Sequence, residues 1–408
     1  MIALDLIYRM NTYAFELGRI KELAVAELKS LFGDDSVEEI IDNYAIVRTD
    51  HTATQKTQDR LGGIIKIIEI TEEDTNPPKN PQELETKFKE HIQSILSGYI
   101  RTKDTSGKTL FAINAINLPG SSKIFLKNSL IFSKKFLKSS TISSRFINKP
   151  WTNTTSAQVY KSKILEKGVE ITVLFSPKTN KIFAGKTISI QNLDNYSLRD
   201  YKKPKRDAHL GMLPPKLAQI MINLAEPNIL EPNKTIYDPF CGTGTVLTES
   251  LLMNKDANGS DLQERMTEYS DENCKWLTKE FHTHNKFHTF TKDAILLTKE
   301  DVPQNIDAVI TEGYLGKPQS TIVPKEQRDK IFGELGELHK GWLTNIHPLL
   351  TPGTPIIMCL TAFNIGHDIE HFPEFEQLAK KAGFKILQTF TYSRKDQMIV
   401  RDIIVMVS

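Results

Sequence analysis

The pattern of apolar positions predicts an N-terminal region that mixes helix and strand. Apolar residues recur at intervals of three and four along residues 20–32, which predicts an amphipathic helix. An alternating pattern at 44–47 and an apolar run at 63–68 predict strands. Residues 72–81 are polar and contain three prolines, a composition typical of a boundary loop. The pattern therefore predicts a small α/β domain over residues 1–80.

A second region with both kinds of element follows this break. Apolar residues at helical spacing predict helices at 82–96 and 129–138. The predicted strands are 109–115, 144–147, 169–175 and 181–187. We therefore expect a second α/β domain over residues 81–190, followed by a basic linker at 191–212.

The rest of the chain alternates strands with helices. The predicted strands are 235–237, 257–260, 288–291, 306–310, 355–360, 384–390 and 399–405, and the predicted helices are 246–253, 266–281, 326–347 and 372–382. This alternation predicts a parallel sheet between two layers of helices, in a seven-stranded α/β domain over residues 213–408. The last two strands form a hairpin at the sheet edge, where Arg394 and Arg401 are expected as solvated charges.

A glycine turn joins the first strand of this half to its first helix. Its sequence is Tyr237-Asp238-Pro239-Phe240-Cys241-Gly242-Thr243-Gly244-Thr245. Glycines at the carboxyl end of a parallel strand let the backbone approach a ligand closely. The spacing is not the Gly-x-Gly-x-x-Gly of dinucleotide enzymes, and no Gly-Lys-Ser/Thr of a phosphate loop follows. On the glycines alone, an ordinary tight turn is the simpler interpretation.

A carboxylate follows the next predicted strand. Asp261 comes about twenty residues after the glycines, the interval at which such folds place an acidic residue on a ribose. Two carboxylate oxygens are suited to accept hydrogen bonds from the two hydroxyls of a ribose. The alternative role for Asp261 is the N-cap of the following helix. We favour the ribose contact.

The stretch Asp-Pro-Phe-Cys-Gly-Thr-Gly resembles the first motif of S-adenosylmethionine (SAM) methyltransferases that modify exocyclic amines of nucleic-acid bases. The resemblance implies a Rossmann-like fold and SAM as the cofactor. The cofactor-binding residues that it implies are Asp238, Phe240, Gly242, Thr243, Gly244, Asp261, Asp293 and Pro214. Asp293, after the third strand, would lie near the adenine amine, with a turn residue as its alternative. Pro214 precedes a helix that, by the resemblance, would lie beside the methionine end of SAM. Packing of that helix explains the same position equally well.

The fourth strand of this half leads into a loop with candidate catalytic residues. Base-amine methyltransferases usually carry Asp/Asn-Pro-Pro-Tyr/Phe here, where oxygens accept hydrogen bonds from the target amine and the ring stacks on the flipped base. This chain has Thr311-Glu312-Gly313-Tyr314-Leu315 instead. The resemblance implies that Thr311, Glu312 and Tyr314 are catalytic. The two prolines are missing, so the alternative is a domain that binds the cofactor without catalysis.

Positive charge is concentrated in one part of the chain. Residues 105–165 contain ten basic residues and no Asp or Glu, whereas the whole chain has a net charge of only +2. Such a block is typical of a surface that neutralises phosphates, with a solvated lysine face as the alternative. The candidate RNA-binding residues are Lys134, Lys135, Lys138, Arg145 and Lys149.

Aromatic residues interleave with this basic block, namely Phe125, Phe132, Phe136, Phe146 and Trp151. Rings of this kind stack on unpaired bases in some RNA-binding proteins. We favour a core position for them.

A second resemblance covers the middle of the chain. Ser143-Ser144-Arg145-Phe146 and Ala184-Gly185-Lys186-Thr187, followed by Asn195-Tyr196-Ser197-Leu198-Arg199-Asp200-Tyr201-Lys202-Lys203-Pro204, look like the THUMP RNA-binding domain and connector of tRNA guanine-N2 methyltransferases. The resemblance implies that residues 81–190 form a THUMP domain and that tRNA is the partner.

Composition adds limits to this picture. Of the 408 residues, 39% are hydrophobic and 25% charged, which predicts folded domains and not wholesale disorder. Cys241, Cys274 and Cys359 are widely spaced, so we expect no disulfide framework and no metal site. No apolar run reaches membrane-spanning length, so a cytoplasmic protein is expected. No pattern indicates or excludes an accessory subunit.

Together the motifs and resemblances predict a SAM-dependent RNA methyltransferase that acts on the exocyclic N2 amine of a guanosine in tRNA. Three alternatives stay open at this point: a catalytically silent tRNA-binding protein with a methyltransferase fold, a DNA amino-methyltransferase, and a SAM enzyme that acts on a small molecule.

Overall fold

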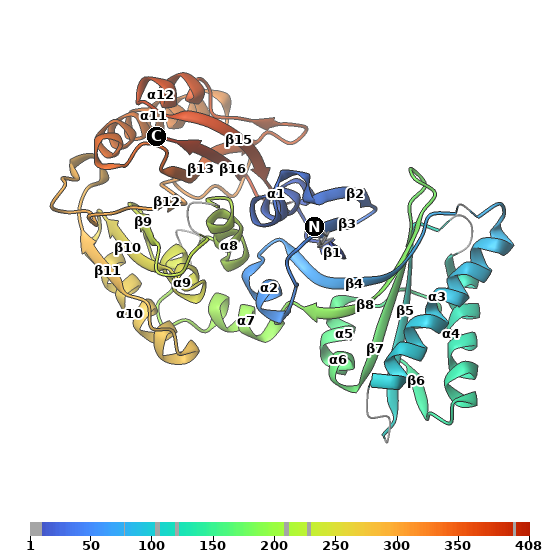
Figure 1. Cartoon of the computed structure of the whole chain (residues 1–408). Helices are drawn as coiled ribbons and strands as arrows, with labels where there is room; N and C mark the ends of the chain where they lie inside the picture. Colours follow the sequence, from blue (N-terminus) through green and yellow to red (C-terminus); the bar gives the residue numbers. More distant parts are fainter. Residues whose placement is uncertain are drawn as a thin grey trace, which may run out of the picture. The chain divides into compact units, whose positions relative to one another are not determined.

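The chain folds into two compact units, Met1–Leu193 and Asp194–Ser408 (Figure 1). The computed structural model describes residues 10–76, 78–102, 107–118, 122–207, 212–226, 230–394 and 397–408. Each unit has its own eight-stranded sheet. The α/β class predicted from the sequence is confirmed in both.

The first unit is built on one continuous sheet of order β2-β3-β1-β4-β8-β7-β5-β6. The strands are β1 (Asn11–Leu17), β2 (Val37–Ile41), β3 (Tyr44–Thr49), β4 (Ile64–Asp74), β5 (Thr109–Ile116), β6 (Ser144–Phe146), β7 (Gly168–Phe175) and β8 (Ile182–Ile190). The long strand β4 pairs with β1 on one side and with β8 on the other. The sheet therefore continues across residue 80, where a domain boundary is expected. That boundary stays a prediction.

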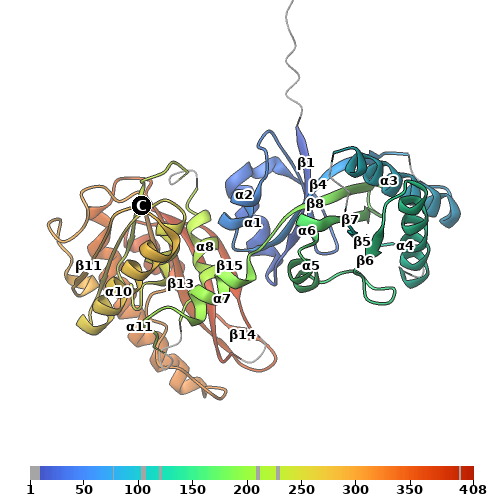
Figure 2. The same cartoon turned by 90° about the horizontal axis from the view of Figure 1, so that it is seen from below.

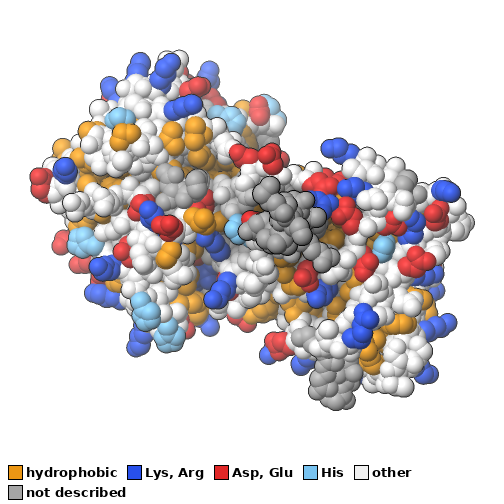
Figure 3. Space-filling view, viewed as in Figure 1, with side chains coloured by type: hydrophobic (Ala, Val, Ile, Leu, Met, Phe, Trp, Pro, Cys, Tyr) orange, Lys and Arg blue, Asp and Glu red, His pale blue; other side chains and the backbone are white. Residues whose placement is uncertain are grey.

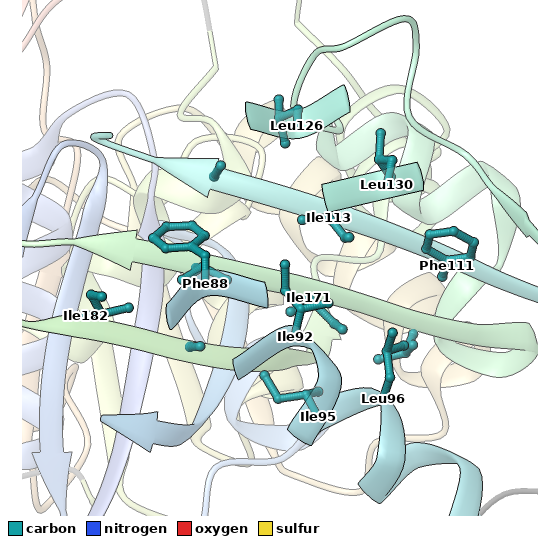
Figure 4. Packing of buried hydrophobic residues seen from close by; sticks show 14 of the residues in the cluster. Phe88, Ile92, Ile95, Leu96, Phe111, Ile113, Leu126, Leu130, Ile171 and Ile182 are labelled. Atoms are coloured by element: carbon teal, nitrogen blue, oxygen red, sulfur yellow. The ribbon is translucent and has the colours of Figure 1, made fainter. Parts of the chain in front are cut away.

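Six helices pack on this sheet within the described part of the unit: α1 (Lys21–Phe32), α2 (Gln55–Arg60), α3 (Pro81–Thr102), α4 (Ser122–Ser139), α5 (Ser156–Ser162) and α6 (Ile164–Lys167). The apolar faces of α3 and α4 form one core with β5, β7 and β8. Figure 4 shows Phe88 and Ile92 of α3 and Leu130 of α4 against Phe111 and Ile171 of the sheet. Helix α4 begins earlier than the predicted helix at 129–138.

The second unit has a mostly parallel sheet of order β11-β10-β9-β12-β13-β16-β15, and β14 pairs with β13 at its end. The strands are β9 (Thr235–Asp238), β10 (Asp256–Asp261), β11 (Phe287–Thr291), β12 (Ala308–Thr311), β13 (Pro355–Asn364), β14 (Ile369–Glu370), β15 (Lys385–Tyr392) and β16 (Ile399–Val407). Strands β9 to β13 run parallel, and β16 is antiparallel to β13 and β15. The edge strand is β15, so β16 and its Arg401 lie inside the sheet.

Helices cover both faces of this second sheet (Figure 2). They are α8 (Pro215–Asn223), α9 (Thr245–Leu252), α10 (Glu264–Phe281), α11 (Lys325–Ile346) and α12 (Phe375–Lys381), with α7 (Leu193–Tyr201) before them. Trp342 of α11 packs in a core with Tyr237 and Ile404 of the sheet. Helices α9 and α10 pack on the other face around Ala257. Because β9 to β12 are parallel, their carboxyl ends meet at one edge of the sheet.

Two features are absent from the described residues, a membrane-spanning helix and a cluster of metal ligands. None of the helices in this part of the chain combines the length and apolarity needed to cross a membrane. No three His, Cys, Asp or Glu side chains among these residues lie together in a way that suits a metal ion.

Candidate functional site

The turn after β9 presents backbone at the carboxyl edge of the sheet. Gly242 and Gly244 have φ angles of 52° and 79°, in the left-handed region that glycine adopts without strain. A Cβ atom added to Gly242 would have no neighbour within 4 Å, whereas one on Gly244 would lie 2.3 Å from the Oγ atom of Ser270. Gly242 therefore leaves room for a ligand, and Gly244 lets helix α10 pack closely.

Asp261 ends β10 and lies directly against this turn. Its Oδ2 atom accepts a hydrogen bond from the Gly242 amide at 3.0 Å, and its Oδ1 atom accepts one from the Gln263 amide at 3.0 Å. Each carboxylate oxygen retains capacity for a further donor. Burial raises the pKa of Asp261, against the opposing effect of these two amides. The N-cap of α10 is Gln263 and not Asp261.

Asp238 is a buried carboxylate with no cation beside it among the described residues. Its side chain is 2% exposed, and its Oδ1 atom accepts a hydrogen bond from the Phe240 amide at 3.0 Å. Burial raises its pKa to about 7, while hydrogen bonds from Thr311 and Phe240 hold the pKa down and the charges of Asp261 and Glu312 raise it further. The unit thus keeps an acidic group at an energetic cost, which is typical of functional sites.

A two-part cleft opens at this edge of the sheet. The smaller part, of about 70 Å³, is lined by Asp238, Thr243 and Thr245 among others, and the larger part, of about 420 Å³, by Asp261, Asp293 and Tyr314 among others. Both parts are also lined by Phe240, Gly242, Met266 and Glu312. The cleft therefore brings together most of the candidate cofactor residues with the candidate catalytic loop.

Three candidate residues take positions that differ in detail from the expectation. Asp293 lines the larger part and also caps a short turn, because its Oδ1 atom accepts a hydrogen bond from the Ile295 amide at 3.1 Å. Pro214 precedes α8 but is not a lining residue; Met212 and Leu213 line the smaller part in its place. Gly244 faces α10 and not the cleft.

The loop after β12 holds the three candidate catalytic residues. Thr311 is buried, hydrogen-bonds to Asp238 through its hydroxyl, and accepts a hydrogen bond from the Gly313 amide at 3.1 Å. Gly313 has a φ angle of 68°, which proline cannot adopt because its ring fixes φ near −65°. Tyr314 is 46% exposed at the mouth of the larger part. The glycine thus sets a different loop path from that of a Pro-Pro sequence.

Arg401 is the partner of Glu312, and the prediction that it is a solvated edge charge is wrong. It is 8% exposed, and its Nε and Nη2 atoms lie 2.7 and 2.6 Å from the Oε1 atom of Glu312. Burial disfavours the guanidinium charge, but Glu312 raises the pKa of Arg401 above its usual value. The sequence held a signal, since a charge inside the apolar run of β16 needs a buried partner.

Lys203 is another functional candidate that the sequence pattern did not reveal. It belongs to the run 202–206 that is expected as a basic linker, yet it is 7% exposed. Its Nζ atom donates a hydrogen bond to the Oγ1 atom of Thr245 at 3.1 Å. Burial lowers the pKa of Lys203 to about 8. Helix α7, just before it, is fixed by an Arg199–Glu249 ion pair of 2.8 Å.

The candidate RNA-binding residues lie on the first unit. Lys134, Lys135 and Lys138 project from α4, Arg145 from β6 and Lys149 from the loop after it, and all five are exposed. None of the five forms an ion pair with a described residue. Figure 3 shows Lys and Arg side chains along the edge of the first unit that carries α4 in Figure 1.

The neighbouring aromatic rings lie between the basic side chains and the core. Phe125, Phe136, Phe146 and Trp151 pack on the core, as expected, whereas Phe132 is half-buried and is not part of that cluster. Lys134 lies over the Phe146 ring at 6.0 Å and Lys127 over the Trp151 ring at 5.6 Å.

Comparison with known proteins agrees with this geometry. Residues 199–305 match the family of RMKL-like methyltransferase domains. The chain is 30% identical over 160 residues to the tRNA (guanine(10)-N2)-dimethyltransferase of Methanothermobacter thermautotrophicus, covering 39% of this chain and 41% of the relative. The enzyme of the same name from Methanocaldococcus jannaschii is 28% identical over 162 residues, covering 38% and 44%. The matches thus span about two fifths of the length of these curated relatives.

Solved structures agree on the fold. TrmN from Thermus thermophilus has a TM-score of 0.53 at 15% identity, over 98% of this chain and all of the other. A possible methylase from Clostridium difficile 630 has a TM-score of 0.50 at 13% identity, over 97% and 98% of the two chains. The Rossmann-like methyltransferase fold and the resemblance to tRNA guanine-N2 methyltransferases are confirmed.

Proposed function

We propose that this chain transfers a methyl group from SAM to the exocyclic N2 amine of a guanosine in tRNA. The observation that carries the proposal is a single cleft whose walls include both the Gly242–Asp261 corner and the Glu312–Tyr314 loop. One corner suits a nucleoside, and the loop offers a carboxylate and an aromatic ring to a base. The choice of guanine as the base and of tRNA as the substrate is supported by the names of the relatives.

The residues of the cleft fit SAM. Asp261 has free acceptor capacity for the ribose hydroxyls, and Asp293 lies on the same larger part for the adenine amine. Asp238 and Thr243 line the smaller part, which suits the methionine end. When bound, the cofactor supplies a methyl group on a sulfonium sulfur, and the electrons of the broken carbon–sulfur bond stay on that sulfur as the amine nitrogen takes the methyl group.

The loop after β12 orients the amine. The Oε1 atom of Glu312 is held by Arg401, which leaves Oε2 to accept a hydrogen bond from the target amine. Tyr314 stacks on the flipped base at the mouth of the cleft. Such contacts contribute mainly by orientation, because they aim the nitrogen lone pair at the methyl group. The proton that the amine loses passes to Glu312 and then to solvent.

The first unit would dock the tRNA in the cytoplasm. We propose that residues 81–190 act as a THUMP domain after a small domain at 1–80, and that 191–212 connect them to a methyltransferase domain at 213–408. Lys134, Lys135, Lys138, Arg145 and Lys149 would contact phosphates.

The test of this docking surface is a salt titration of tRNA binding. Replacing Lys134, Lys135 and Lys138 with Gln should weaken binding and reduce the slope of log Kd against log salt by about one for each phosphate that is no longer neutralised. A matched triple replacement of Lys325, Lys330 and Lys340 on α11 serves as the control. An unchanged slope in the α4 variant contradicts the surface.

Methyl transfer is tested with purified protein, SAM and unmodified tRNA, followed by mass spectrometry of the nucleosides. We expect N2-methylated guanosine with wild type, a large loss with Glu312→Ala, and no change with Glu334→Ala, an exposed carboxylate on α11. Transfer to DNA in place of tRNA would favour the DNA amino-methyltransferase.

A second candidate, a silent tRNA-binding protein, is favoured by Gly313, whose φ of 68° departs from the Pro-Pro geometry of active enzymes. It predicts cofactor and tRNA binding without any transfer by wild type.

A further inference from the structure

Lys203 is a buried cation that forms no ion pair with a described residue. It is 7% exposed, its one hydrogen bond goes to the hydroxyl of Thr245, and no described carboxylate lies within ion-pair distance. An ammonium group has three N–H donors, so two of them have no acceptor among the described residues. Burying a charge without a partner is costly, which makes a missing anion the natural explanation.

The surroundings of Lys203 increase the cost of burying its charge. Thr245 is the first residue of α9, whose amino end carries a partial positive charge. The acids whose charges reach Lys203 are Asp200, Glu249 and Glu312, and all three lie beyond ion-pair distance. Glu249 pairs with Arg199 through its Oε1 atom, and Glu312 pairs with Arg401. A buried lysine at the positive end of a helix, with no described acid within ion-pair distance, is unfavourable unless a further negative group joins it.

A carboxylate without a neighbouring cation among the described residues lies on the smaller part of the cleft. Thr245, which receives the Lys203 hydrogen bond, lines the smaller part of the cleft together with Asp238. Asp238 is 2% exposed and has no described cation beside it. The cavity wall thus includes a carboxylate, that of Asp238, without an ion pair among the described residues. The ammonium group of Lys203 also lacks an ion pair there, and it lies behind Thr245, to which it is hydrogen-bonded.

We propose that Lys203 binds the carboxylate of the amino-acid end of the cofactor, while Asp238 receives its ammonium group. A zwitterionic amino acid is the chemical class that pairs with both groups at once. The assignment rests on the proposed function, because it takes SAM as the ligand of the cleft. It adds a binding residue from the segment before α8, outside the glycine motif.

The experiment compares three ligands by calorimetry: S-adenosylhomocysteine, its analogue without the carboxylate, 5′-deoxy-5′-(3-aminopropylthio)adenosine, and methylthioadenosine, which lacks the amino-acid end. Wild type should prefer S-adenosylhomocysteine over the decarboxylated analogue by about 10- to 100-fold, the range of a hydrogen bond between charged groups. In Lys203→Met the two ligands should bind equally well. Methylthioadenosine should bind both proteins alike, which reports an intact fold.

Lys202→Met, at an exposed neighbouring position, is the matched control and should keep the preference of wild type. A Lys203→Met protein that still prefers S-adenosylhomocysteine by tenfold overturns the assignment and gives Lys203 a purely structural role. If that variant does not fold, Lys203→Gln is used, and wild type with less than about twofold preference overturns the assignment without any variant. Wild type that binds none of the three ligands overturns the proposed function itself.

Discussion

Asp238 makes cofactor binding depend on pH. Its pKa of about 7 in the ligand-free protein means that the carboxylate is about nine tenths ionised at pH 8 and about one tenth ionised at pH 6. Only the ionised form can pair with the ammonium group of the cofactor. Lys203, with a pKa of about 8, roughly doubles its protonated fraction over the same interval and offsets part of this loss. We therefore expect the affinity for S-adenosylhomocysteine to fall about fivefold from pH 8 to pH 6.

The same carboxylate affects stability with a definite sign. The pKa of Asp238 is 3.8 for an unperturbed group and about 7 in the folded protein, so between these values the folded state holds a proton that the unfolded state has lost. Its contribution to the free energy of unfolding therefore decreases as pH rises from 4 to 7. The full shift corresponds to roughly 4 kcal/mol.

Asp238→Asn separates these effects from the other titrations. Calorimetry with S-adenosylhomocysteine and urea unfolding of the ligand-free protein are measured from pH 4 to pH 8.5 for wild type, Asp238→Asn and the exposed control Asp329→Asn. The Asp238 variant should bind more weakly at pH 8, lose the fall in affinity between pH 8 and pH 6, and gain stability at neutral pH. The reasoning is refuted if wild type binds equally well at pH 6 and pH 8, or if the variant keeps the wild-type slope.

Three further changes test the site. Arg401→Met should lower methyl transfer roughly 100-fold with unchanged S-adenosylhomocysteine affinity, and Arg401→Lys should recover part of the rate because it keeps a cation beside Glu312. Gly244→Ala should destabilise the protein by more than about 2 kcal/mol in urea, whereas Gly242→Ala should cost only about 1 kcal/mol and weaken cofactor binding instead. Between pH 8 and pH 10, the unfolding free energy of wild type should rise relative to Lys203→Met by roughly 2 kcal/mol, because the lysine has a folded pKa of about 8.

The sequence was informative where local pattern and topology determine position. A strand, a glycine turn and a helix place Gly242 at the carboxyl edge of a parallel sheet, and a second parallel strand then places Asp261 beside it. The basic residues of α4 were also accessible to this reasoning, because an acid-free segment has no local partner that would bury its charges.

Residues whose role depends on distant partners were not accessible in this way. Arg401 meets Glu312 only because β16 inserts next to β13, a pairing that the order of elements does not specify. Lys203 looked like one of several linker charges, and its burial follows from a contact with Thr245. Gly244 resembles Gly242 in sequence, and only its neighbour in α10 assigns it to packing.

The same distant contacts explain how the catalytic loop can work without its prolines. In a Pro-Pro sequence, rigidity is local, since each ring fixes its own φ angle. Here three strands hold the loop. Thr311 of β12 accepts a hydrogen bond from the Gly313 amide, and Thr361 of β13 donates one to the Leu315 carbonyl at 3.1 Å. Arg401 of β16 forms an ion pair with Glu312. The freedom that Gly313 introduces is therefore restrained on both sides. Removing the Thr361 or the Arg401 anchor should affect transfer more than cofactor binding, because these two act on the loop alone, whereas Thr311 also hydrogen-bonds to Asp238 of the glycine turn.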